Sequence, residues 1–505
     1  MPVPASLPLP DALSLETCGG RVRVEWDPQA PVTPLGQLVF FAQFLQTSGR
    51  FPRWVQDCPW SYTSPNAPAV SDVLGTVLLS VLCGHHRYAH VSALRGDQVN
   101  PPLLGMSQVV SEDSVRRALA KGHAQADERQ ALTAWQVQHL RESYGPLLTV
   151  PWILDIDSTI KTIYGHQEGA QVGYNPHKRG RPAHVYHTYL MGATRLVLDV
   201  EVQPGKQTAA AHALPGLWRL LDGWPAHAQP WLVRGDCSFG QEGVMRQAEA
   251  RGRAYLFKLR LTHRPKDLIR LLEQQGHWQD AGQGWQGREG VLPLHGWSRA
   301  RRVIVLRRPV KRAPAAAPSG QRLLDWPESF PTSAPEYEYA VLVTSLTASL
   351  LTVAQLYRDR GDAENNFDEL KNQWGWAGFT TSDLYRCQAM ARHIALIYNW
   401  WSLFVRLADP SVRREAITSR PLLLHAVARQ STHAGQTVVS VTPLHAEAPK
   451  IRHMLTILSQ FLSALKATAE QLTDGQRWCR ILSRIFQAVL GGVELKMPAW
   501  VPAAG

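Results

Sequence analysis

Two short apolar segments of this chain each end in an aspartate. Residues 150–157 read VPWILDID, and residues 231–236 read WLVRGD. Short apolar runs bounded by loop-forming residues are typical of buried β-strands. The ends of such strands meet at one rim of a sheet, where α/β folds gather their ligand sites. The two segments therefore predict an α/β domain with Asp157 and Asp236 at one rim.

The pattern around these segments extends the prediction to a particular sheet. Strands are expected at 184–192, 196–202 and 255–259, and helices at 209–221 and 241–252. Together with the two aspartate-ended segments, they give three strands, a helix, a strand, a helix and a strand. This is the order of a ribonuclease-H-like core. Residues 261–346 break the alternation and are predicted to form a β-rich insertion.

The segment that follows the insertion is predicted to be a single helix over residues 350–373. At about 100° per residue, Tyr357, Arg360, Glu364 and Lys371 fall within an arc of roughly 60°. A surface helix more often spreads its charges in alternating pairs. One carboxylate among two cations and a phenol indicates a metal ligand that faces a polyanion. The other acids of this helix, Asp362, Asp368 and Glu369, are expected to be solvated.

The spacing Y-x2-R-x3-E-x6-K of this helix resembles the signature of a large group of bacterial insertion-sequence transposases with an Asp-Asp-Glu active site. The residues around the aspartates are similar too: Asp157 is followed by Ser-Thr, and Asp236 lies in RGDCSF. Cys237 departs mildly from that group, which more often has a small residue there. The resemblance covers roughly residues 100–410 and implies cut-and-paste chemistry on DNA.

Three regions are expected along the chain. Residues 1–145 form a mostly helical N-terminal region that contributes to DNA binding, after a Pro-rich irregular lead-in to residue 34. The capped start at residues 111–114 fits either a helix-turn-helix or a packing helix. Residues 146–380 form the ribonuclease-H-like catalytic domain, and residues 381–505 form a helical C-terminal region.

The resemblance makes Asp157, Asp236 and Glu364 the expected catalytic residues and metal ligands. Three carboxylates brought together repel one another unless cations neutralise them. Hard oxygen ligands of this kind suit Mg2+ or Mn2+, and two such ions assist an in-line phosphoryl displacement. Asp155 competes with Asp157, because alternation along a strand puts both on one face. The match to Asp-Ser-Thr favours Asp157.

The net charge of +12 favours a polyanionic partner. A basic run without acids at 299–312 predicts a strand pair that presents arginines to the DNA backbone, with a solvated hairpin as the alternative. Its members are Arg299, Arg301, Arg302, Arg307, Arg308, Lys311 and Arg312. A second basic loop lies close in sequence to Asp157 and contains His177, Lys178, Arg179 and Arg181.

By the resemblance, Tyr357, Arg360 and Lys371 hold phosphates beside the cleaved strand. Some members of the group also stack a flipped base on an aromatic residue of the insertion. Trp285, Trp297 and Tyr339 are the candidates here, with core packing as the alternative for each.

The function expected from the resemblance is that of a transposase that binds terminal inverted repeats as a homodimer, cuts the element ends and joins the 3′ ends to target double-stranded DNA. A nuclease of the same fold without strand transfer, and a non-catalytic DNA-binding repressor, are the rivals. The N-terminus has no secretory signal, and the apolar run near 73–83 is too short to span a bilayer. A cytoplasmic, nucleoid-associated protein without membrane contact is expected, and the six scattered cysteines fit a reducing compartment.

Overall fold

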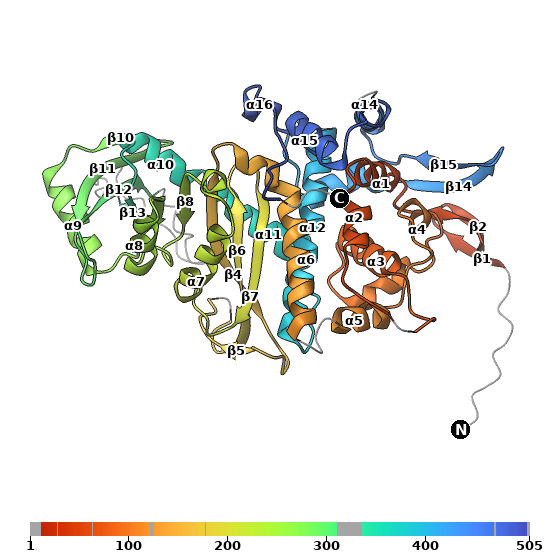
Figure 1. The fold of residues 1–505 in the computed structure, drawn as a ribbon, viewed down its shortest axis with the longest axis horizontal. Helices are drawn as coiled ribbons and strands as arrows, with labels where there is room; N and C mark the ends of the chain where they lie inside the picture. Colours follow the sequence, from red (N-terminus) through yellow and green to blue (C-terminus); the bar gives the residue numbers. More distant parts are fainter. Residues whose placement is uncertain are drawn as a thin grey trace, which may run out of the picture.

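A large mixed β-sheet runs through the centre of the protein (Figure 1). The computed structural model describes residues 12–27, 29–62, 64–121, 126–176, 178–310, 336–468 and 471–501, without the side chains of residues 12, 210, 213, 214 and 362–364. Over these residues the sheet has ten strands in the order β10-β11-β12-β13-β9-β8-β4-β6-β5, with β7 also paired to β6. They are β4 (Ile153–Thr162), β5 (Gln171–Val172), β6 (Pro182–Met191), β7 (Leu196–Pro204), β8 (Leu232–Gly235), β9 (Ala254–Lys258), β10 (Gln279–Gly282), β11 (Trp285–Leu292), β12 (Arg301–Pro309) and β13 (Tyr337–Thr344).

Five of these strands form the ribonuclease-H-like core. β6 is antiparallel to both β4 and β7, and β8 and β9 run parallel to β4 and to each other. The helix α7 (Ala209–Asp222) precedes β8, and α8 (Glu242–Ala250) precedes β9. The order along the chain is therefore three strands, a helix, a strand, a helix and a strand. The fold prediction is confirmed in class and in the order of its core elements.

The insertion continues the core sheet. It begins with the helix α9 (His263–Gln275), and its last strand, β13, pairs antiparallel with the core strand β9. The strands β10 to β13 therefore extend the sheet to its far edge, at the left of Figure 1. The chain then enters α10 (Leu350–Arg358), which contacts β9, β10, β11 and β12. The insertion is therefore joined through β9 to β8, the strand that leads into Asp236.

Helices from both ends of the chain pack together on the other side of the sheet (Figure 1). The long helix α12 (Leu384–Ala408) is buried along most of its length and contacts α1, α3, α6, α14 and α15. No helix among the described residues combines the length and apolar character needed to cross a bilayer. The helices of these regions are α1 (Leu38–Thr47), α2 (Arg50–Gln56), α3 (Val70–Leu82), α4 (Asn100–Leu103), α5 (Glu112–Lys121), α6 (Ala126–Tyr144), α13 (Ala416–Leu423), α14 (Ala448–Ala467), α15 (Asp474–Ile485) and α16 (Gln487–Leu490), with 3-10 turns at Tyr88–Leu94, Gly145–Thr149 and Ala226–Ala228.

Two hairpins differ from the prediction. The lead-in, expected to be irregular, contains β1 (Ala12–Thr17) and β2 (Gly20–Glu25). The C-terminal region at 381–505, expected to be helical, contains β14 (Val427–His433) and β15 (Gln436–Thr442), and β14 also pairs with β3 (Val32–Thr33). The β-branched content of β15 and the positive φ angles of Ala434 (48°) and Gly435 (78°) account for the second hairpin, because a two-residue turn of this kind joins antiparallel strands.

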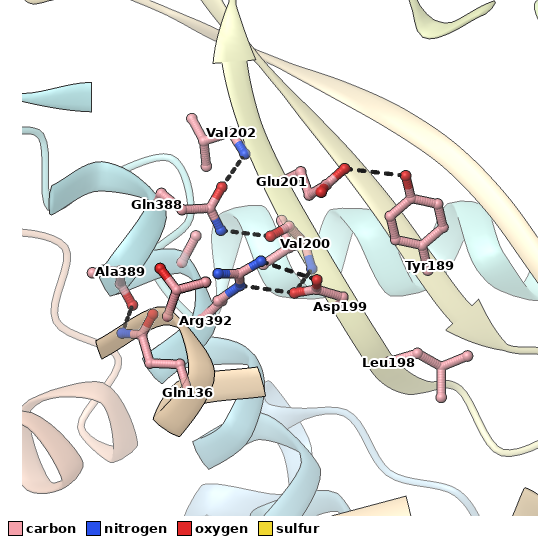
Figure 2. A network of polar contacts seen from close by, with 12 residues as sticks. Gln136, Tyr189, Leu198, Asp199, Val200, Glu201, Val202, Gln388, Ala389 and Arg392 are labelled. Carbon is pink, nitrogen blue, oxygen red and sulfur yellow. Dashed lines mark hydrogen bonds and ion pairs between the residues drawn. The ribbon is translucent and has the colours of Figure 1, made fainter. Parts of the chain in front are cut away.

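The helix α12 also covers the free edge of the core sheet (Figure 2). The Gln388 side chain donates to the Val200 carbonyl at 2.6 Å and accepts from the Val202 amide at 2.5 Å. Arg392 forms a buried two-point ion pair with Asp199, at 2.9 and 3.0 Å. Exposed edge strands invite pairing with other chains, and side chains of α12 satisfy the outer backbone groups of β7 instead.

Candidate active site

The sheet brings the two predicted aspartates together. The parallel ladder of β4 and β8 pairs Asp155 with Arg234 and Ile156 with Gly235. Asp157 and Asp236 are the next residues on each side, so they lie at the same level on neighbouring strands. Adjacent strands are about 4.8 Å apart. Two carboxylates therefore project from neighbouring backbone positions where β8 ends.

Local hydrogen bonds orient both side chains. The Ser158 amide donates to Asp157 Oδ1 at 2.7 Å. The Ser238 amide donates to Asp236 Oδ1 at 2.9 Å, in the turn that follows β8. Such bonds limit the rotation of each carboxylate. Ser238 therefore helps to position Asp236, a role that the sequence motif RGDCSF did not reveal.

Asp155, the competing carboxylate, is committed to a buried ion pair. Its two oxygens accept from Arg234 Nε and Nη2 at 2.6 and 2.7 Å, and the two side chains are only 4% and 3% exposed. Burial raises the pKa of Asp155, and the Arg234 guanidinium opposes that rise. Arg234 also donates to the Leu356 carbonyl near the end of α10. The pair therefore fastens β4, β8 and α10 to one another.

The predicted single helix is two helices with a tight turn between them. α10 ends at Arg358, and α11 (Gly361–Asn372) begins after Asp359 and Arg360. The amide of Arg360 donates to the Tyr357 carbonyl, three residues back, which is a 3-10 arrangement. The expectation of one continuous helix is therefore wrong. Gly361 weakens helix propensity at this point, and Arg360 turns into the site.

Arg360 contacts the first aspartate directly. Its Nη2 donates to Asp157 Oδ2, and its side chain is only 4% exposed. Burial alone would lower the pKa of Arg360, but the charges of Asp157, Tyr357 and Asp236 raise it. Tyr357 is half-buried near the end of α10. Arg358 turns the other way, towards Gln355, to which its Nη2 donates at 2.8 Å.

The remaining two residues of the predicted signature lie further along α11. The backbone of Glu364 is about one helical turn after Arg360, and its side chain lies outside the described residues. Lys371 is half-buried in the last turn, about 16 Å from Arg360 along the axis. No group of three His, Cys, Asp or Glu side chains suited to a metal ion occurs among the side chains that the structure describes.

The other acids of α11 differ in their surroundings. Glu369, expected to be solvated, is buried at 3% exposure and accepts from Arg413 at 2.8 Å and from the Trp374 indole at 3.1 Å. That expectation is wrong because the face of α11 that carries Glu369 packs on the segment before α13. Asp368 is exposed, as expected, and Asn372 donates to it at 2.7 Å. The Asp362 side chain lies outside the described residues.

The described arginines of the basic run at 299–312 are paired with carboxylates of the core helix α8 and of the insertion. Arg301 is only 3% exposed and pairs with Glu242 at 2.5 Å and Glu249 at 2.8 Å. The prediction that Arg301 contacts DNA is therefore wrong, because its guanidinium is enclosed by glutamates. The others have acidic partners as well: Arg299 with Glu249, Arg302 with Glu289, Arg307 with Glu273, and Arg308 with Glu338. Lys311 and Arg312 lie outside the described residues.

The aromatic candidates of the insertion pack on its core. The Tyr339 hydroxyl donates to Glu273 at 2.7 Å. Trp297 is partly buried, with the Arg301 guanidinium 5.1 Å from its ring centre. Trp285 is also partly buried, beside Arg308. These contacts correspond to packing within the insertion and not to stacking on a flipped base.

The second basic loop has a different environment. Lys178, Arg179 and Arg181 have no carboxylate partner among the described residues. Arg179 is exposed, and the contacts of Lys178 and Arg181 are with Tyr164. The cations of this loop are thus available to an external anion. His177 lies outside the described residues.

Comparison with known proteins shows the family of the chain. Residues 67–461 match the family described as transposase DDE domain group 1. This match spans more than half of the chain, so the chain belongs to that family. None of the curated proteins that were compared matches it. Among solved structures, a piggyBac transposase synaptic complex with hairpin DNA aligns over 92% of this chain and 88% of its own, at 9% identity and a TM-score of 0.38.

Proposed function

We propose that this chain is a DNA transposase of the insertion-sequence group with the Y-x2-R-x3-E-x6-K signature. The observation that carries the proposal is the meeting of Asp157 and Asp236 on parallel strands, with Arg360 against Asp157, in a member of a transposase family. Glu364 completes the proposed catalytic set, since it follows Arg360 by one turn of α11. The enzyme would bind terminal inverted repeats as a homodimer, cleave the element ends and join the 3′ ends to target DNA.

The donor set suits a divalent cation. Asp157 and Asp236 offer carboxylate oxygens from adjacent strands, and the cation that contacts Asp157 in the structure is the Arg360 guanidinium. Hard oxygen donors of this kind hold Mg2+ or Mn2+. Asp157, Asp236 and Glu364 would hold the metal, which would neutralise their charges and polarise the scissile phosphate. The hydrogen bonds from Ser158 and Ser238 would keep the two aspartates in place for this role.

The surrounding cations have proposed roles on the DNA backbone. Arg360 and Tyr357 would hold a phosphate at the reacting site, where small displacements are costly. Lys371 would contact a phosphate about three helical turns further along α11. Lys178, Arg179 and Arg181 would contribute backbone contacts, which supply most of the affinity of proteins for DNA. Residues 146–380 would form the catalytic domain, between helical regions at 1–145 and 381–505.

The test is DNA cleavage by purified protein with Mg2+ or Mn2+, on a duplex that carries the inverted repeats flanking the gene. Asp157→Ala, Asp236→Ala and Glu364→Ala should each abolish cleavage and leave DNA affinity within about threefold, because affinity comes from cations on phosphates. Asp368→Ala is the matched control on α11, since Asp368 is exposed and should retain wild-type rates. Full cleavage in excess chelator, or by any of the three variants, would contradict the proposal.

A second assay separates the transposase from its rivals. Pre-cut ends incubated with target plasmid should give strand-transfer products if the chain is a transposase. Cleavage without these products would identify a nuclease of the same fold. Binding of the repeats without cleavage at any divalent cation would identify a repressor.

A further inference from the structure

Two exposed tyrosines stand beside the basic loop that lacks acidic partners. Tyr164 is 67% exposed and Tyr174 is 77% exposed, which is unusual for large aromatic side chains. Tyr164 follows the end of β4, and Tyr174 lies in the segment between β5 and β6. The Asn175 side chain donates to Thr162 Oγ1 at 3.1 Å, which ties the two segments together.

The ring of Tyr164 is left open by its neighbours. Lys178 Nζ lies 2.5 Å from the Tyr164 hydroxyl and 5.0 Å from the ring centre. The ammonium is thus farther from the ring centre than from the hydroxyl, by nearly the full distance between the ring centre and the hydroxyl oxygen. This is possible only if the ammonium lies past the hydroxyl, at the edge of the ring and close to its plane. It therefore covers neither face. The Arg181 guanidinium, at 5.9 Å from the ring centre, is at the outer limit of a cation–π contact.

Several contacts anchor the described residues on either side of this loop. The buried Asn175 also accepts from the Lys178 amide at 3.0 Å. Gly173 lies so close to the carbonyl of Gly205 that a Cβ at this position would be 1.9 Å from the oxygen, so only glycine fits. On the other side of the loop, the Glu168 amide donates to the Ser382 carbonyl ahead of α12. These contacts anchor the backbone that carries Tyr174 and Lys178.

We infer that Tyr164 and Tyr174, with Lys178, Arg179 and Arg181, form a binding site for unpaired nucleotides of DNA. The inference rests on the proposed function for the identity of the nucleic acid. Cations bind the phosphates of either a duplex or a single strand, but an aromatic ring face is useful only to a base whose own face is free. Open rings beside unpaired cations therefore favour an unstacked strand over a closed duplex.

The position of the site on β4 relates it to the active site. Asp157 and Thr162 are five residues apart on this strand, which corresponds to about 17 Å. A DNA strand that is still base-paired at its reacting phosphate beside Asp157 covers that distance in about five nucleotides, at the duplex rise of about 3.4 Å. The unpaired bases would thus lie roughly five nucleotides from the cleaved bond.

The experiment compares single-stranded and duplex DNA by fluorescence anisotropy, using fluorescein-labelled (dT)20 and a 20-base-pair duplex at one salt concentration. Tyr164→Ala and Tyr174→Ala should each weaken binding of (dT)20 by about tenfold and change duplex affinity by less than about threefold. Tyr164→Phe keeps the ring and should bind (dT)20 like the wild type.

Trp26→Ala is the matched control. Trp26 is 65% exposed, but the nearby Arg21 and Arg23 are paired with Glu16 and Glu25. This variant should leave both affinities unchanged. Equal losses on the single strand and the duplex in the alanine variants, an equal loss in Tyr164→Phe, or wild-type binding of (dT)20 by Tyr164→Ala would each overturn the inference.

The outcomes also distinguish this inference from the proposed function. If binding of (dT)20 depends on the tyrosine rings but the protein cleaves no DNA with any divalent cation, the binding site is supported and the proposed transposase activity is refuted. If the protein cleaves DNA with a divalent metal but its tyrosine variants bind (dT)20 normally, the transposase activity is supported and the binding site for unpaired nucleotides is refuted.

Discussion

The buried pair of Asp155 and Arg234 predicts a separation between stability and activity at the centre of the sheet. Asp155 and Asp157 lie two residues apart on one strand, yet one is enclosed by Arg234 and the other contacts Arg360 in the candidate site. Replacing Asp155 should therefore damage folding, whereas replacing Asp157 should damage chemistry.

The magnitude follows from the environment of the pair. Asp155→Ala removes both carboxylate acceptors of a guanidinium that is 3% exposed and leaves it only the Leu356 carbonyl. Removing one partner of a buried ion pair costs about 3–5 kcal/mol. Arg234→Ala leaves the buried Asp155 carboxylate without its partner in the same way and should lower the free energy of unfolding by a similar amount. Asp157→Asn, at a side chain that is 17% exposed, should cost about 1 kcal/mol.

The assay is thermal and urea unfolding of the four proteins, with hydrogen exchange of β4 and β8 to localise the effect. The double variant Asp155→Leu with Arg234→Met is the decisive control. It leaves no unpaired charge, so it should be more stable than either single variant and its cost should fall well below the sum of the two single costs. Single variants that unfold like the wild type, or a double variant at least as unstable as the sum of the two, would refute the reasoning.

Three further predictions concern other contacts of the fold and site. Arg360→Ala should reduce cleavage by about a hundredfold in a rate assay while Arg358→Ala cleaves normally, because Arg360 contacts Asp157 whereas Arg358 donates to Gln355; equal defects in the two variants would refute this role of Arg360. Although burial opposes it, the hydrogen bond from His212 and the charge of Arg219 lower the pKa of Glu201 to about 2, below its ordinary 4.5. Its stabilisation, up to about 3 kcal/mol, is present above pH 4.5 and lost as the pH falls towards 2, so the difference in unfolding free energy between the wild type and Glu201→Gln should shrink over that range. Gln388→Ala should cost about 1–3 kcal/mol and increase exchange of the Val202 amide, because it uncovers the edge of β7.

The sequence predicted the fold well where a strong local pattern is compatible with only one kind of secondary structure. Apolar runs of strand length predicted β4 and β8, and the order of elements predicted the core. Asp236 follows the end of β8 as predicted, but Asp157 lies within β4, which continues to Thr162, so the prediction that Asp157 ends its strand is wrong. The hairpin β1–β2 was missed although Leu13 and Leu15, and then Val22 and Val24, alternate with polar residues, because the prolines around it favoured an irregular segment. The hairpin β14–β15 was missed because its strands are short and mostly exposed, so they bury little apolar surface. The break between α10 and α11 was missed because Asp359 and Arg360 keep helical dihedral angles, and only the hydrogen-bond pattern changes.

The fate of individual charges was harder to predict, because it depends on residues far away in the sequence. Arg301 is surrounded by arginines along the chain, yet it pairs with Glu242 and Glu249, more than fifty residues earlier. Glu369 sits on a helix rich in acids, yet it is buried against Arg413. A local run of one sign therefore indicates a charged surface only when the fold brings no opposite charge to it.

This rule separates the two basic segments of the chain. The strand β12 crosses a sheet whose neighbouring elements carry glutamates, and the described arginines of that segment are neutralised there. The loop that bears Lys178, Arg179 and Arg181 reaches beyond β6, where tyrosines and not carboxylates are its neighbours. Counterion release requires cations that are not already paired within the protein. The loop should therefore dominate the salt dependence of DNA binding, and β12 should contribute little, although β12 is the more basic of the two in sequence.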